Sequence, residues 1–312
     1  MAGPLGRRAR TLEEIGINMT ALLESAPLDQ YRPLETRPGD IYLTSWTKCG
    51  TTLMQQMFHQ IRMLAATGKA DMDFDDITRV TPWEDTAPTL DLDMNLPQRA
   101  APRGFKSHRP HNRLPADARF VVTLRDPKES YVSYFRDVDG WHFEEGALGI
   151  EEFLPLWLLG GPAGCDYFTH LLSWYARRDE PDTLLADYRE AARDRAAMVD
   201  RLAAFMGVKL APDQAALVVE MTSRDYMYAH RDRFDDAMLC RVMEERIGVP
   251  FSSDSTKVQA IGSEAGDVPE AIAAQIDAIW AERVLPATGH ADFASLAASL
   301  SQGQCANAAE AR

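Results

Sequence analysis

The segment from Ser45 to Thr52, which reads Ser-Trp-Thr-Lys-Cys-Gly-Thr-Thr, constrains this chain more than any other. It follows the apolar residues 41–43 and precedes residues 53–58, which favour a helix. The order predicts a strand, a tight turn and a helix N-terminus gathered around Lys48. The first N–H groups of a helix lack intrahelical partners and carry partial positive charge, so such a corner binds phosphate or sulfate. The alternative is a glycine turn with an exposed lysine.

Composition narrows the class of protein. The chain has 312 residues, of which 46% are hydrophobic and 26% charged. These values are typical of a globular protein with one large α/β domain or two small ones. A formal net charge of −14 argues against general nucleic-acid binding, which favours a basic face. No apolar run approaches the roughly 20 residues that a membrane-spanning helix needs.

The cysteines indicate a reducing compartment. Cys49, Cys165, Cys240 and Cys305 are widely spaced, without a C-x-x-C pair and without a histidine at metal-ligand spacing. This pattern fits free thiols better than a disulfide framework or a zinc site. The basic residues 7–10 are not followed by the apolar stretch of a signal peptide. We therefore expect a cytoplasmic protein that binds no metal; the sequence is compatible with an oligomer.

The chain divides into three parts. Residues 1–39 read as a polar leader with a short helix over 12–23, and residues 40–300 as the main domain. Residues 301–312 lack a core pattern and are expected to form a disordered tail.

Within the main domain, strands alternate with helices. After the first strand at 41–43, strand-like segments occupy 103–108, 119–124 and 183–188, and a helix is predicted from 189 to about 206, with Gly207 as its cap. This alternation predicts an α/β fold in one domain, with a parallel sheet, helices on both faces and a P-loop-like nucleotide-binding core.

A second motif begins where the strand at 119–124 ends. Arg125 stands at the carboxyl end of that strand, where open α/β sheets bind ligands, and Pro127 is well placed in a first helical turn. Ser133 lies about two helical turns further on and can face the same crevice. Because a guanidinium can bind a phosphate with two parallel hydrogen bonds, Arg125 is a candidate phosphate ligand.

A third motif is the segment Lys106-Ser107-His108-Arg109-Pro110. A single histidine is more often structural than catalytic, but His108 ends a short strand beside a proline turn, at the edge of the expected cleft. Histidine titrates near neutral pH and therefore suits proton transfer. His111, three residues later, is the competing candidate.

Taken together, these motifs resemble those of the cytosolic-type sulfotransferase family, in the form of a bacterial-like member. Residues 47–52, T-K-C-G-T-T, are similar to the family's P-K-S-G-T-T loop, which binds the 5′-phosphosulfate of 3′-phosphoadenosine 5′-phosphosulfate (PAPS). Residues 125–134 resemble its R-x-P-K-x-x-x-x-S-Y element, and residues 106–110 resemble its K-T-H-x-P element. The family order is followed over about residues 40–295.

The resemblance implies a PAPS-dependent sulfotransferase that moves a sulfuryl group to a hydroxyl by in-line displacement. It makes His108 the general base, places Lys48 at the bridging oxygen and lets Lys106, with residues 50–52, hold the sulfuryl oxygens. PAPS is then a co-substrate, released as 3′-phosphoadenosine 5′-phosphate (PAP), and no metal is required.

The resemblance also implies which residues bind the nucleotide. They are the loop residues Lys48, Cys49, Gly50, Thr51, Thr52 and Leu53, the 3′-phosphate ligands Arg125 and Ser133, the adenine contact Tyr188, the purine contacts Thr222 and Met227, and Lys257.

One part of the family pattern has diverged. The segment 255–267 keeps two glycines of the loop that closes over the 3′-phosphate, but Gln259 stands where an arginine is expected, and Lys257 is the candidate replacement. Arg224 likewise occupies a usually aromatic position and could be a surface residue. An alternative function is therefore a catalytically impaired nucleotide-binding or regulatory relative. A P-loop-type kinase, which would need ATP and a metal, is a third.

The acceptor is expected to be a small, hydroxylated, partly hydrophobic molecule. Residues 69–102, 135–170 and 225–256 would supply its pocket. The candidate apolar walls are Trp83, Phe135, Trp141, Phe143 and Tyr226.

Overall fold

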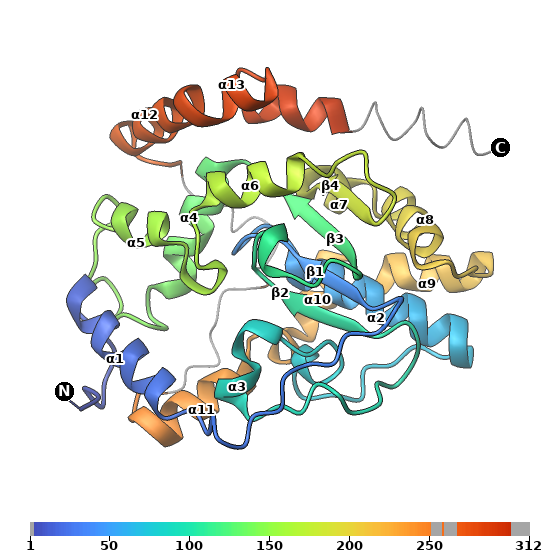
Figure 1. Ribbon diagram of the computed structural model, residues 1–312, viewed down its shortest axis with the longest axis horizontal. Coiled ribbons are helices and arrows are strands. Elements are labelled where there is room, and N and C mark those ends of the chain that lie inside the picture. Colours follow the sequence, from blue (N-terminus) through green and yellow to red (C-terminus); the bar gives the residue numbers. More distant parts are fainter. Residues whose placement is uncertain (1–2, 251–257, 259–266, 301–312) are drawn as a thin grey trace.

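The computed structural model describes residues 3–250, residue 258 and residues 267–300. Lys257, most of the diverged segment 255–267 and the expected tail 301–312 lie outside the described residues. Four parallel strands form one sheet in the order β2-β1-β3-β4 (Figure 1). The strands are β1 (Ile41–Thr44), β2 (Gly104–Ser107), β3 (Arg119–Leu124) and β4 (Thr183–Asp187).

Helices connect and flank the strands. The α-helices are α1 (Leu12–Glu24), α2 (Thr51–Thr67), α3 (Ala87–Leu90), α4 (Pro127–Val138), α5 (Leu154–Leu159), α6 (Tyr167–Tyr175), α7 (Tyr188–Arg193), α8 (Arg195–Met206), α9 (Pro212–Met221), α10 (Arg224–Ala229), α11 (Ala237–Ile247), α12 (Glu270–Ile279) and α13 (Leu285–Thr288). A π-helical turn, Trp280–Val284, joins α12 to α13. Short 3-10 turns lie at Ile77–Arg79, Glu84–Thr86, His111–Arg113, Gly161–Ala163 and Arg231–Arg233.

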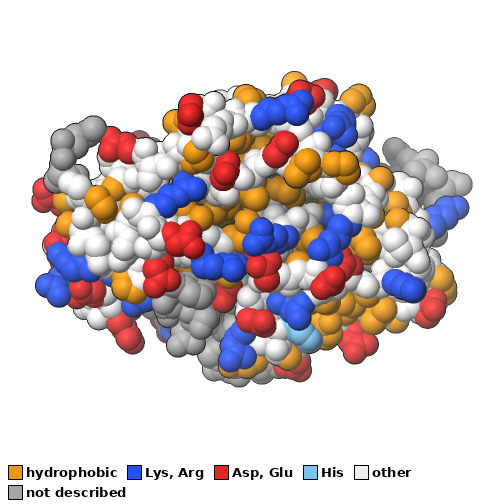
Figure 2. Space-filling view, turned by 90° about the horizontal axis from the view of Figure 1, so that it is seen from below, with side chains coloured by type: hydrophobic (Ala, Val, Ile, Leu, Met, Phe, Trp, Pro, Cys, Tyr) orange, Lys and Arg blue, Asp and Glu red, His pale blue; other side chains and the backbone are white. Residues whose placement is uncertain are grey.

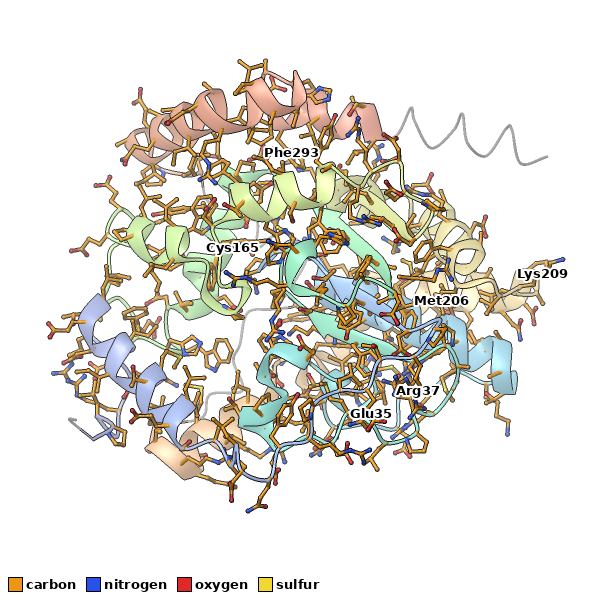
Figure 3. All side chains as sticks on the ribbon, in the orientation of Figure 1. Glu35, Arg37, Cys165, Met206, Lys209 and Phe293 are labelled. Atoms are coloured by element: carbon orange, nitrogen blue, oxygen red, sulfur yellow. The ribbon has the colours of Figure 1, made fainter. Side chains whose placement is uncertain are left out.

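The sheet separates two hydrophobic cores because successive side chains of a strand point to opposite faces. Ile41 and Leu43 of β1 belong to the core that contains α2, α8 and α9 residues, whereas Tyr42 between them belongs to the other core. Met206, at the end of α8, is buried in the first of these cores, whereas Lys209 just beyond it projects outward (Figure 3). Helices therefore cover both faces, as the alternation predicts.

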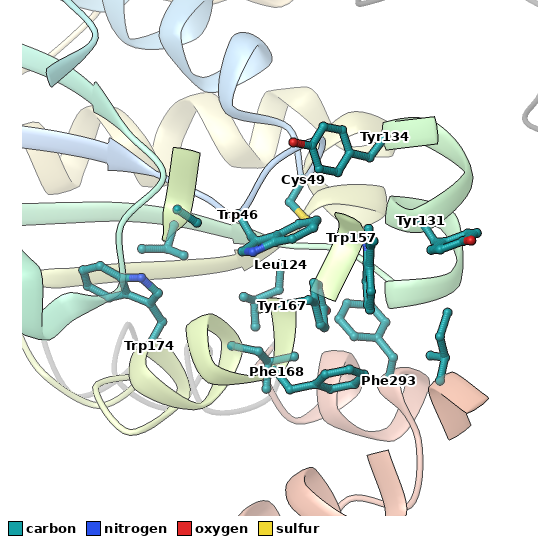
Figure 4. Packing of buried hydrophobic residues seen from close by; sticks show 14 of the residues in the cluster. Trp46, Cys49, Leu124, Tyr131, Tyr134, Trp157, Tyr167, Phe168, Trp174 and Phe293 are labelled. Carbon is teal, nitrogen blue, oxygen red and sulfur yellow. The ribbon is translucent and has the colours of Figure 1, made fainter. Parts of the chain in front are cut away.

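The second core is rich in aromatic residues. Trp46, which follows β1, has its ring centroid 5.4 Å from that of Trp157 of α5 and 5.6 Å from that of Tyr167 of α6 (Figure 4). Phe293 packs into the same core from the C-terminal helical arm. These contacts fix the chain immediately before the 47–52 turn, so the turn is held from behind by a large buried cluster.

A third, smaller cluster lies away from the sheet. It joins Leu22 of α1 to Trp83, Trp141 and the α11 residues Leu239 and Met243. The N-terminal helix is therefore packed against a segment more than two hundred residues later in the chain, and α1 and α11 lie side by side in Figure 1.

The structure confirms all four expected strands and the helix of the leader, and it corrects one prediction. The single helix expected over 189–206 is two helices, α7 and α8, which are separated at Asp194. The Asp194 side chain accepts a hydrogen bond from the Ala197 N–H and so acts as an N-cap, which starts a new helix instead of continuing the old one.

The surface and the described residues can be searched for a basic face, a membrane-spanning helix and a metal site. On the face shown in Figure 2, basic and acidic side chains are interspersed, and no broad basic area covers that face. Within residues 3–250, 258 and 267–300, no helix is long and apolar enough to cross a bilayer, and no group of three or more His, Cys, Asp or Glu side chains is placed to hold a metal ion.

Candidate active site

A large cavity opens at the carboxyl ends of the strands, beside the point where β1 connects to β2 on one side and pairs with β3 on the other. Open α/β sheets bind ligands at this kind of switch point. The cavity has a volume of about 1280 Å³, above the roughly 300–1,000 Å³ of an ordinary small-molecule site. Its lining includes most of the residues predicted from the sequence: Lys48, Gly50, Thr51, Thr52, Leu53, Lys106, His108, Arg125, Ser133, Tyr188, Thr222 and Met227.

The turn between β1 and α2 depends on its glycine. Gly50 has φ +102°, a conformation that L side chains rarely adopt, and Lys48 has φ +63°. A Cβ atom on Gly50 would lie 2.3 Å from Cδ2 of Tyr188. Glycine is therefore required at this position both by the backbone and by the close approach of the Tyr188 ring.

Hydrogen bonds fasten this turn to its neighbours. Thr123 of β3 donates its hydroxyl to the Cys49 carbonyl at 2.6 Å and its N–H to Ser45 Oγ at 2.8 Å. Arg125 donates from Nη1 to the Lys48 carbonyl at 3.0 Å. The two predicted phosphate-binding segments are thus directly linked, because Arg125 holds the backbone that carries Lys48.

The start of α2 provides donors for an anion. The first bond between helical residues four apart runs from the Met54 N–H to the Gly50 carbonyl, so the N–H groups of Thr51, Thr52 and Leu53 have no intrahelical acceptor. The hydroxyls of Thr47 and Thr51 are buried and have no hydrogen-bond partner among the described residues. Because buried polar groups are nearly always paired, these orphaned donors fit a phosphate or sulfate group bound here.

Lys48 forms a buried ion pair across the cavity wall. Its Nζ lies 2.7 Å from Oδ1 of Asp137, in the last turn of α4, and the two side chains are 11% and 5% exposed. In this state the ammonium is held by a carboxylate. To contact a ligand, the Lys48 ammonium must either break its ion pair with Asp137 or bind Asp137 and the ligand at the same time.

Lys106 lies in a desolvated place beside an aromatic ring. Its side chain is 3% exposed, its Nζ is 3.4 Å from the centre of the Trp83 ring, and Oδ1 of Asp236 is 3.6 Å away. Burial lowers the pKa of Lys106 to about 8, although the charges of Asp76 and Asp85 oppose this effect. The lysine therefore changes its charge within a range that activity measurements can reach.

His108 is oriented by two hydrogen bonds. Its Nδ1 lies 2.6 Å from the Ser45 carbonyl oxygen, and its backbone N–H donates to Oδ2 of Asp85 at 2.7 Å. A carbonyl oxygen only accepts, so Nδ1 carries the proton and the neutral ring has its lone pair on Nε2. The Trp83 ring meets the imidazole edge-on, with centroids 5.3 Å apart. In this tautomer, Nε2 of His108 is the nitrogen that can accept a proton.

The opposite part of the cavity is rich in arginine. Arg125 lies over the Tyr188 ring, 5.0 Å from its centre, and Glu129 pairs with both Arg125 and Arg189. Arg195 and Arg224 also line the cavity. Several guanidinium groups in one cavity suit a nucleotide with more than one phosphate, in a protein whose net charge is −14.

Some predicted residues lie elsewhere. Cys49 does not line the cavity: it is buried in the aromatic core, its N–H donates to the Trp46 carbonyl, and burial raises the pKa of its thiol to about 12. The expectation that Cys49 contacts the nucleotide is therefore not supported by its position. His111, the competing histidine, packs against Phe120 and Trp174 outside the cavity.

The expected acceptor walls are partly correct. Trp83 and Trp141 line the cavity, whereas Phe135, Phe143 and Tyr226 do not. Phe143 is fully buried in the aromatic core and is therefore not available to a ligand in the cavity.

Two sets of cavity residues were missed by the sequence reasoning. Asp137 follows Ser133 by one helical turn, so the helical spacing alone could have placed it beside the site. The second set is a stripe of six α1 residues, whose contact with the cavity depends on where the leader packs. The stripe consists of Leu12, Ile15, Gly16, Met19, Leu22 and Leu23.

The family profile and two curated relatives that match this chain are all sulfotransferases. The sulfotransferase domain profile matches residues 38–239. Sulfotransferase 6B1 of Danio rerio is 26% identical over 204 residues, covering 64% of this chain and 67% of that protein. The amine sulfotransferase of Oryctolagus cuniculus is 22% identical over 211 residues, covering 66% and 68%.

Solved structures share the fold. Mouse sulfotransferase SULT7A1 complexed with PAP matches with a TM-score of 0.58 and 18% identity, covering 93% of this chain and 95% of that one. Retinol dehydratase in a complex with retinol and PAP matches with a TM-score of 0.59 and 17% identity, covering 85% and 86%.

Proposed function

The chain belongs to the sulfotransferase domain family, which confirms the resemblance seen in its motifs, and we propose that it transfers a sulfuryl group from PAPS to a hydroxyl of a small acceptor. The observation that carries this proposal is the meeting of Lys48, Lys106, His108 and the N-terminus of α2 in one cavity. A binding protein has no use for an oriented base and two lysines beside an anion site.

The donor nucleotide is bound by the arginine-rich part of the cavity. The free N–H groups at the start of α2, with the Thr51 hydroxyl, receive the 5′-phosphosulfate. Arg125 and Ser133 bind the 3′-phosphate, and the Tyr188 ring contacts the adenine. Thr222 and Met227 line the same space and complete the purine pocket. Binding energy of this kind lowers the Michaelis constant without itself accelerating the chemical step.

The residues of this chain divide the chemistry among them. Nε2 of His108 takes the proton of the acceptor hydroxyl as the acceptor oxygen forms its bond to sulfur. The bond from sulfur to the bridging oxygen breaks, and its electron pair stays on the phosphate, where the Lys48 ammonium stabilises the new charge. Lys106 holds the peripheral sulfuryl oxygens while it is protonated. The transfer itself is an in-line displacement, as in phosphoryl transfer.

The donor is tested by ligand-dependent stability. A ligand present at about 100 times its dissociation constant stabilises a one-site protein by about 2.7 kcal/mol, so PAP should raise the unfolding temperature. ATP with magnesium is the comparison. Stabilisation by ATP with magnesium and not by PAP would contradict the proposal and favour a kinase.

Catalysis is tested by transfer of radiolabelled sulfate from PAPS to a panel of alcohols and phenols. Lys48→Ala should lower turnover by about 10²–10³, the effect of losing one preorganised charge stabiliser. His108→Ala should lower it by about 10²–10⁴, the range for a general base. His111→Ala is the matched control and should retain activity. A protein that binds PAP but transfers sulfate to no acceptor would instead be the catalytically impaired relative.

A further inference from the structure

One face of α1 forms a continuous wall of the cavity. The α1 residues that line it recur at helical spacing and therefore share one stripe, from Leu12 to Leu23. Eleven helical rises separate these two residues, so the wall is about 17 Å long. All of α1 lies outside the part of the chain that matches the family profile, which begins at residue 38. The match to the family profile therefore says nothing of which residues form this wall.

The two ends of this wall contact different parts of the protein. Leu22 belongs to the small cluster that includes Trp83, and Trp83 packs against both His108 and Lys106. Ile15, nearer the start of α1, belongs to the aromatic core with Trp157 of α5. The wall therefore begins beside the catalytic groups and runs away from them toward α5.

The outer end of the cavity remains apolar up to the surface. Leu156 and Leu159 of α5 both line the cavity, and Leu159 is 71% exposed. A cavity with an imidazole at its buried end, apolar α1 residues along one wall and an exposed leucine at its outer end suits a ligand with a polar end and a long apolar body.

Gly16 stands in the middle of this wall and lacks a structural reason to be glycine. It lies inside a regular helix, where glycine is less favourable than alanine by about 1 kcal/mol, and its φ is not positive. A Cβ atom placed there would meet no atom within 4 Å. Neither the backbone nor neighbouring side chains exclude a larger residue. The space beside Gly16 belongs to the cavity.

We infer that Gly16 is a specificity-determining notch in the α1 wall, and that the acceptor is an elongated apolar alcohol whose hydroxyl lies at His108 and whose chain passes Gly16 toward Leu159. This inference rests on the proposed sulfotransfer and names its acceptor class. Each methylene that enters an apolar wall of this kind contributes about 0.8 kcal/mol, so kcat/KM should rise about fourfold per methylene until the chain reaches the surface.

The first test uses unbranched primary alcohols from butanol to dodecanol with PAPS as donor. Gly16→Leu fills the notch, and its kcat/KM should fall progressively with chain length, by at least tenfold for the longest alcohols relative to butanol. Thr20→Leu is the control, because Thr20 is exposed on the same helix and does not line the cavity. Its chain-length profile should follow that of the unmodified protein.

The second test asks whether the acceptor chain runs along the α1 wall toward Leu159. It remains informative if Gly16→Leu fails to fold. Leu159→Ser should reduce kcat/KM only for the longest alcohols and leave butanol unaffected, because Leu159 lies at the exposed end of the cavity. Leu96→Ser is the control: Leu96 is 61% exposed and does not line the cavity.

The outcomes separate this inference from the proposed function. If PAP stabilises every variant and butanol is sulfated, the proposed function stands. The inference about Gly16 alone would then be overturned by either of two results. One is a kcat/KM that does not change with chain length in the unmodified protein, and the other is an equal loss of kcat/KM at all chain lengths in both cavity variants.

Discussion

Replacement of Gly50 by alanine tests whether the turn before α2 and the Tyr188 ring form one nucleotide-binding unit. At φ +102° an L residue is strained by about 1–2 kcal/mol. The added Cβ would also lie 2.3 Å from Tyr188 Cδ2, against a normal carbon–carbon contact of about 3.5 Å. The ring must therefore move by about 1.2 Å, and overpacking of this kind costs about 1–3 kcal/mol.

Gly68→Ala is the matched control for strain. Gly68 caps the other end of α2 with φ +71°, and a Cβ there meets nothing within 4 Å. It should lose only the strain, about 1–2 kcal/mol, whereas Gly50→Ala should lose about 2–5 kcal/mol. Thermal or urea unfolding of both variants measures the difference.

Nucleotide affinity gives the second measurement. Stacking of a base on an aromatic ring is worth about 1–3 kcal/mol, so displacement of Tyr188 should raise the dissociation constant of PAP about 5- to 150-fold in Gly50→Ala. Isothermal titration should find the Gly68→Ala value unchanged. Equal stability losses in the two variants, or undiminished PAP binding by Gly50→Ala, would refute the reasoning.

Two further predictions concern the charged residues. Because the pKa of buried Lys106 is about 8, the rate of sulfotransfer should decline as the pH rises above 8. Lys106→Met should have a lower rate that no longer declines in this range, and a pH–rate profile of both proteins measures the difference. The unfolded chain holds this proton up to about pH 10.4, so stability should rise between about pH 8 and 10.4 in the parent but not in Lys106→Met, as measured by denaturant unfolding. Asp137→Asn leaves the Lys48 ammonium without its counter-charge and should cost about 3 kcal/mol. PAP should then raise the unfolding temperature more in Asp137→Asn than in the parent, because its phosphate restores a counter-charge; an equal rise would contradict the assigned Lys48 contact.

Local sequence was enough to predict the elements that build the anion site. The strand at Arg119–Leu124 was predicted with its observed bounds because a continuous β-branched run between charged residues is a strong local signal. The turn at 47–52 was predictable because a glycine between a strand and a helix start has few conformations open to it. Motif order then placed Lys48, His108 and Arg125 at strand ends, and strand ends of a parallel sheet share one edge.

Contacts between distant segments could not be read in this way. The pairing of Lys48 with Asp137 joins residues 89 positions apart. Helical spacing puts Asp137 on the same face of α4 as Ser133, but only the folded chain brings Lys48 within reach of its carboxylate. Cys49 lies inside the motif, yet its side chain is buried in the aromatic core and not in the cavity, which only the packing of Trp46 and its neighbours reveals.

The sequence by itself determined the fold class, the family, and the positions of Lys48 and His108 after neighbouring strands, because each depends on residues close together in the chain. The tertiary structure decided what surrounds that corner. It packed α1 against α11 at the side of the cavity, buried Lys106 against Trp83 and gave Lys48 a carboxylate partner. These features depend on how the apolar faces of distant segments are buried against one another. Many packing arrangements would bury those faces, and only the folded chain shows which arrangement is adopted.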